Sequence, residues 1–117
     1  MTISWMLGVQ FLVAAQMAAD KPQLIGRAEL PADMADKSGL TGDAAPGVPN
    51  DRLGSCGSSI AWTGEGDDYV MVDDRGPGDG AYAFACRFQR VRISIDTKSA
   101  EPVRMQLIST TLLQTED

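Results

Sequence analysis

The side chains with the clearest chemical potential cluster in the segment 73–80, Asp-Asp-Arg-Gly-Pro-Gly-Asp-Gly. Carboxylate oxygens beside flexible glycine backbone are suited to hard cations such as Ca²⁺, which takes six to eight oxygen ligands. Asp74 and Asp79 are therefore candidate ligands for Ca²⁺ or another divalent metal. The segment lacks the spacing of an EF-hand loop, so this prediction rests on composition. The alternative is that Asp74 and Arg75 form an ion pair that fixes a turn.

A second polar cluster, Pro49-Asn50-Asp51-Arg52, precedes the first by about twenty residues in the chain. If its loop folds toward segment 73–80, Arg52 and Arg75 could together bind a phosphate or carboxylate, because guanidinium groups bind these anions through paired hydrogen bonds. Asp51 would then be a third candidate metal ligand. This combination permits hydrolysis of a phosphoester. Salt bridges that only fix the loops would explain the same residues.

Other catalytic chemistries are excluded within this chain. It contains no histidine, which removes imidazole bases, histidine-ligated zinc and histidine pH switches. Ser58 and Ser59 lie in the sequence G-S-S-I-A, which differs from the G-x-S-x-G nucleophile elbow. A serine esterase mechanism is therefore not expected, and no catalytic residue is assigned.

The chain has two cysteines, Cys56 and Cys86. In an oxidising compartment a disulfide between them would stabilise the fold by about 3–4 kcal/mol in the chain-entropy model. The alternative is that Cys86 is a small buried apolar residue within an alternating strand. A metal site built on two cysteines is disfavoured because no further cysteine or histidine could complete it.

The composition is that of a folded acidic protein. Of the 117 residues 44% are hydrophobic and 22% are charged, and the net charge is −6. Binding to a nucleic-acid backbone needs a clustered cationic surface, so nucleic acid is not an expected partner.

The first nineteen residues are expected to be a signal peptide. No charged residue occurs from Ile3 to Ala19, and the apolar run ends in Ala18-Ala19. That run is shorter than the roughly 20 apolar residues needed to span a bilayer. We therefore expect export to the periplasm or the cell exterior and no stable membrane span.

Alternating apolar residues and turn clusters predict an antiparallel all-β domain over residues 20–117. A long loop is expected over 33–57 and a bulge near Gln89 and Arg90. The expected strands are a leading strand at 23–30 and four later strands at 58–63, 68–73, 82–96 and 103–113.

Four consecutive antiparallel strands form the unit of a β-propeller blade. Because propellers contain about 4–8 blades, a chain of this length would hold one blade and the leading strand of a larger propeller. The remaining blades, or self-association, are then expected to cover its open faces. A small free-standing sheet is the alternative.

Residues 36–113 resemble the N-terminal part of the family called esterase-like activity of phytase, or phytase-like. The resemblance is carried by DKSGLTGD (36–43), PNDRLGS (49–55), GSSIAWTGEGDDYVMVDDRGPGDGA (57–81), ACRF (85–88) and STTLL (109–113). It implies an exported propeller whose full-length form hydrolyses phosphate or related esters. The sequence GSCGS places Cys56 where the family has a small residue, so the resemblance does not imply a disulfide. A non-catalytic propeller used for binding or as a scaffold is the alternative function.

Overall fold

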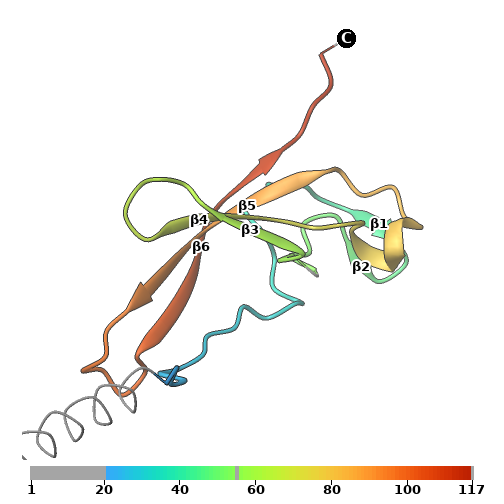
Figure 1. Ribbon diagram of the computed structural model, residues 1–117. Coiled ribbons are helices and arrows are strands. Elements are labelled where there is room, and N and C mark those ends of the chain that lie inside the picture. Colours follow the sequence, from blue (N-terminus) through green and yellow to red (C-terminus); the bar gives the residue numbers. More distant parts are fainter. Residues whose placement is uncertain (1–20, 55, 117) are drawn as a thin grey trace, which may run out of the picture.

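The computed structural model describes residues 21–54 and 56–116 (Figure 1). The predicted signal peptide, 1–19, lies outside these residues. The described chain is an all-β structure with one short 3₁₀ helix. In chain order its elements are β1 (Asp43–Ala45), β2 (Val48–Pro49), β3 (Ser59–Trp62), β4 (Asp68–Val72), η1 (Pro77–Gly80), β5 (Arg87–Ile95) and β6 (Val103–Leu112).

The main sheet confirms the predicted antiparallel four-stranded meander. Its strand order is β3-β4-β5-β6, so each strand pairs with its neighbour in sequence (Figure 1). The turn Gly64–Asp67 joins β3 to β4, with Ile60 opposite Met71 and Trp62 opposite Tyr69. Short connections join β3 to β4 and β5 to β6, whereas the longer segment 73–86, which contains η1, joins β4 to β5.

A bulge occurs near the predicted position, but its extra residue lies on β6 and not on β5. The register between β5 and β6 shifts between Arg90 and Val91, where Ser109 and Leu107 are the successive partners. The extra residue on β6 places Leu107 opposite Val91 on the buried face, where the exposed fractions of these two residues are 4% and 0%.

The leading strand expected at 23–30 does not form. No strand is assigned there, and no backbone hydrogen bond joins it to a neighbour within the described chain. The segment instead passes close to the start of β6. A Cβ at Gly26 would lie 2.9 Å from Pro102 Cγ. An isolated extended segment is not a strand, because strand structure requires a hydrogen-bonded partner.

The predicted strand 82–96 begins later than expected, at Arg87. Before it, the Phe84 amide donates to the Tyr82 carbonyl at 2.9 Å. Residues 82–86 therefore lie outside strand β5, although the Cys86 carbonyl still accepts from the Leu113 amide at 2.8 Å.

The predicted long loop at 33–57 contains a small hairpin, β1–β2, which the sequence did not predict. Asp43 pairs with Pro49 and Ala45 with Val48. Gly47 occupies the turn with φ 74°, a left-handed conformation that favours glycine.

The loop that carries this hairpin covers one face of the sheet. Leu53 is 2% exposed and packs with Met71, Val91 and Leu107 of the sheet. The partly buried Leu30, Met34 and Cys56 extend this small core. In the described part of the chain no helix has the length and apolar character to cross a membrane.

Candidate functional site

A buried ion pair joins the covering loop to the sheet. Asp36 precedes the hairpin and Arg87 is the first residue of β5. Arg87 Nη1 donates to Asp36 Oδ2 at 2.6 Å, and the two side chains are 2% and 0% exposed. A charge in this environment requires such a partner, because an unpaired buried charge is strongly destabilising.

Further hydrogen bonds extend this pair to β6. Gln89, 1% exposed, donates from Nε2 to Asp36 Oδ2 at 3.5 Å. Its Oε1 accepts from Thr110 Oγ1 at 2.6 Å, and that hydroxyl accepts from the Lys37 amide at 2.8 Å. Loop, β5 and β6 are therefore held together by polar contacts.

The guanidinium of Arg87 is fixed on several sides. Its Nε donates to the Ala85 carbonyl at 2.8 Å, and Nη1 also donates to the Asn50 carbonyl at 2.8 Å. The guanidinium carbon lies 3.9 Å from the centroid of the Phe84 ring, a distance suited to a cation–π contact. Its second terminal nitrogen, Nη2, is buried without a hydrogen-bond partner among the described residues.

Asp73 provides a second buried polar atom of this kind. It follows the last residue of β4, and its Oδ1 has no hydrogen-bond partner among the described residues. The pKa of Asp73 lies above its ordinary value, mainly because burial disfavours the charged carboxylate. The positive charge of Arg87 acts to lower this pKa, and the negative charge of Asp36 acts to raise it. Carboxyls with raised pKa values in cavities are candidates for functional groups.

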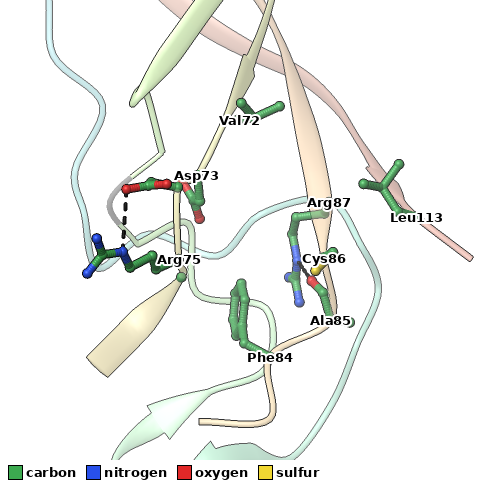
Figure 2. Close-up of a pocket in the computed structure, with 10 residues that line it drawn as sticks. Val72, Asp73, Arg75, Phe84, Ala85, Cys86, Arg87 and Leu113 are labelled. Atoms are coloured by element: carbon green, nitrogen blue, oxygen red, sulfur yellow. Dashed lines mark hydrogen bonds and ion pairs between the residues drawn. The ribbon is translucent and has the colours of Figure 1, made fainter. Parts of the chain in front are cut away.

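Asp73 and Arg87 line the same cavity, which has a volume of 220 Å³ (Figure 2). It lies where β4 ends and β5 begins. Its walls are formed by Val72, Asp73, Asp74, Arg75, Gly76, Phe84, Ala85, Cys86, Arg87 and Leu113. Figure 2 shows the Arg87 guanidinium beside the Phe84 ring.

Arg75, a predicted anion-binding residue, lines this cavity, and its side chain is 61% exposed. Its Nη1 lies 2.9 Å from Asp79 Oδ1, and its Nε lies 3.6 Å from Asp74 Oδ2. Exposed ion pairs like these contribute little to stability.

The candidate metal ligands do not gather into a coordination site. Asp74 and Asp79 flank Arg75. Within residues 21–54 and 56–116 no three side chains of the metal-ligating types cluster closely enough to hold an ion. The metal site therefore stays a prediction, and no chemical step is assigned to a metal.

Asp51 and Arg52 lie in the covering loop. The Asp51 carbonyl accepts from the Asp36 amide at 2.5 Å. Arg52 Nε donates to the Ala32 carbonyl at 3.4 Å. Neither residue lines the cavity that contains Arg75, so the guanidinium that accompanies Arg75 there is Arg87.

The two cysteines are free thiols in the structure. Cys86 is exposed and lines the cavity, whereas Cys56 is half-buried against the core. Burial, then the charges of Asp73 and Asp36, raise the pKa of the Cys56 thiol.

Sequence reasoning missed Asp36, Arg87 and Gln89 as site residues. One signal was available for Arg87 and Gln89: both are polar residues at positions in phase with Val91 on the buried face. A polar side chain at such a position requires a buried partner. Asp36 is 51 residues away from Arg87 in sequence, so its pairing could not be deduced from local pattern.

No protein-family model, curated protein or solved structure matches this chain.

Proposed function

We propose that this chain is the first blade of an exported phytase-like β-propeller whose full-length form hydrolyses phosphate or related esters. The blade assignment is supported by the meander order β3-β4-β5-β6 and by the apolar side chains left exposed on it. The family assignment rests on the sequence resemblance over residues 36–113.

The observation that supports a role in substrate binding is the position of Arg75 on the cavity wall. Its ion pairs with Asp74 and Asp79 are exposed, so solvent screens them and a ligand can replace them at low cost. A phosphate oxygen would gain a charge-assisted hydrogen bond from the same guanidinium. Arg75 is thus a replaceable contact at the site, whereas the Asp36–Arg87 pair is buried and fixed.

A non-catalytic binding or scaffold module is the second candidate. It is favoured by the pairing of Arg75 with both neighbouring carboxylates, because salt bridges that fix a loop give the same arrangement. The two candidates differ in turnover, which an assay measures directly.

The test is hydrolysis of phytate and of simple phosphate esters by the full-length protein, with and without Ca²⁺. The hydrolase proposal expects turnover. It also expects Arg75→Gln to lower kcat/KM by about tenfold or more, the effect of losing a charge-assisted hydrogen bond. Arg104→Gln is the matched control, because Arg104 is an exposed arginine on β6 outside the cavity.

Absence of turnover with every metal tested would leave the binding module as the function. Equal loss in both arginine variants would instead show that overall charge, not the cavity, controls the rate. Cell fractionation of the full-length protein tests export: we expect it outside the cytoplasm, with the leader removed.

A further inference from the structure

The cavity that Arg75 lines has a charged side and an apolar side. Figure 2 shows Arg75 on one side of the cavity and Leu113 on the other. The Arg75 side chain is 61% exposed. Leu113 and Val72, which also line the cavity, are 58% and 37% exposed. A ligand can therefore reach both the guanidinium and the apolar surface.

The apolar side of the cavity suits a small organic group. Val72, Leu113 and the half-buried Phe84 contribute to its walls. An apolar group that packs against such side chains is removed from water, which favours binding. The cavity volume of 220 Å³ is below the roughly 300–1,000 Å³ typical of sites for drug-sized ligands. It therefore suits a single ring or a short alkyl chain.

The charges around the cavity favour a ligand with a single phosphate group. Of the two guanidiniums that line it, Arg87 is held by Asp36 in a buried pair at 2.6 Å, whereas the ion pairs of Arg75 are exposed. Arg75 can therefore match one phosphate. Asp73 and Asp74 also line the cavity, so further phosphates on the same ligand would lie beside acidic side chains and be repelled.

We propose that the substrate bound at this site is a phosphate monoester of a small apolar alcohol or phenol, and that phytate is a poor ligand. The phosphate binds Arg75, and the organic group packs against Val72 and Leu113. Phytate carries a phosphate on every ring carbon, so it offers the apolar side of the cavity nothing to bury. This inference rests on the proposed function and names the substrate class for it.

Ligand-observed NMR on the full-length protein, without added metal, tests this proposal with phenyl phosphate, methyl phosphate and phytate. We expect phenyl phosphate to bind about tenfold more tightly than methyl phosphate, because the ring adds apolar surface that is buried on binding. Phytate should bind more weakly than phenyl phosphate. The measurement is binding, so it does not depend on which residues carry out hydrolysis.

Two variants separate the two sides of the cavity. Leu113→Ala should weaken phenyl phosphate binding by about fivefold, because it removes apolar contact, and should leave methyl phosphate binding unchanged. Arg75→Gln should weaken binding of both esters. Ile95→Ala is the matched control for Leu113→Ala, because Ile95 is 61% exposed and does not line the cavity. It should bind both esters as the wild type does.

Equal affinity for phenyl and methyl phosphate would overturn the proposal, as would tighter binding of phytate or equal effects of Leu113→Ala and Ile95→Ala. If any of these results came with turnover of phosphate esters, the hydrolase proposal would stand and only the substrate class would be wrong. If the expected binding preference came without turnover, the hydrolase proposal would fail and the ligand class would stand. Binding of no probe would overturn both the ligand class and the role of Arg75.

Discussion

At the scale of single residues, the Asp36–Arg87 pair explains how a loop distant in sequence is held on the sheet. The two side chains are almost fully buried, and the loop, β5 and β6 all supply hydrogen bonds around them. A buried pair does not necessarily stabilise more than apolar residues would, but breaking it leaves one charge unmatched. Its removal is therefore the most informative single change in the molecule.

We expect Asp36→Asn to lower the free energy of unfolding by about 3–5 kcal/mol, the usual cost of leaving a buried partner charge uncompensated. Urea denaturation followed by circular dichroism measures it. Asp79→Asn, which breaks only the exposed pair with Arg75, should change the denaturation midpoint little. A similar loss in both variants would contradict the distinction between buried and exposed pairs.

The Asp36 carboxyl should also make the stability of the fold depend on pH. Burial acts to raise the pKa of Asp36, but hydrogen bonds from Ser38 and the interaction with Arg87 bring it below the ordinary value of 3.8. A carboxyl with a lowered pKa contributes stability that is fully present above its ordinary pKa and is lost as pH falls through the folded-state pKa. Thermal melts should show this loss below pH 3.8.

The Asp73 carboxyl should have the opposite effect on the pH dependence of stability. Its pKa is raised, so its destabilising contribution is absent below the ordinary value and fully present above the raised one. Asp73→Asn should therefore be more stable than the wild type at neutral pH, and the difference should vanish in acid. Parallel pH profiles for the wild type, Asp36→Asn and Asp73→Asn would contradict both assignments.

The thiols should react at different rates with a maleimide or a disulfide reagent. Cys86 is exposed, whereas Cys56 is half-buried with a raised pKa. Because the thiolate is the reactive form, we expect Cys86 to be modified first. Mass spectrometry of the labelled peptides identifies the order. A disulfide between the two cysteines would give a different result. In protein prepared under oxidising conditions, neither thiol would be labelled until a reductant was added.

At the scale of elements, the sheet is stabilised by a small core on one face. Among the residues that the structure describes, four apolar ones are buried: Leu53 from the covering loop and Met71, Val91 and Leu107 from three strands. The bulge in β6 places Leu107 opposite Val91. The covering loop and the bulge are thus both required to complete this core.

Leu107→Ala should lower the free energy of unfolding by about 2–5 kcal/mol, the range for leucine-to-alanine changes in a core. Leu113→Ala is the control, because Leu113 is 58% exposed; it should lower stability far less. Denaturant titration of the two variants measures the difference. Equal destabilisation would show that Leu107 is not part of the central core.

At the scale of the whole molecule, the sheet leaves apolar side chains uncovered. Ile60 and Trp62 lie on the edge strand β3 and are 52% and 60% exposed. Edge strands with unpaired backbone groups and apolar side chains favour association. Adjacent blades of the proposed propeller would cover this surface.

We expect the 117-residue chain alone to associate in a concentration-dependent manner and to be only marginally stable. Ile60→Lys should reduce this association, because a charge on an edge strand opposes pairing. Sedimentation velocity over a concentration series measures it, and Arg104→Glu, on the other edge strand, reports the effect of charge alone. A monomer with a sharp, concentration-independent melting transition would contradict this expectation.

The sequence by itself determined the main sheet. Alternating apolar residues and turn clusters placed four antiparallel strands to within a few residues. The expected bulge was close to the observed one, but the structure has it on β6 and not on β5. These features depend on near neighbours in the chain, so local pattern is sufficient to predict them. The strand predicted at 23–30 does not form, because no neighbouring strand pairs with this segment among the described residues. The residue pattern shows that a segment is suited to a strand, but it does not show whether a pairing partner is present.

Only the tertiary structure decided which polar residues meet. The candidate site residues predicted from the sequence are charged residues in loops: Asp51, Arg52, Asp74, Arg75 and Asp79. The structure pairs Asp36 with Arg87 across 51 positions and brings Arg87, not Arg52, to the cavity that Arg75 lines. The physical reason is that loop closure over the sheet is a long-range event driven by burial of Leu53, which no local spacing encodes.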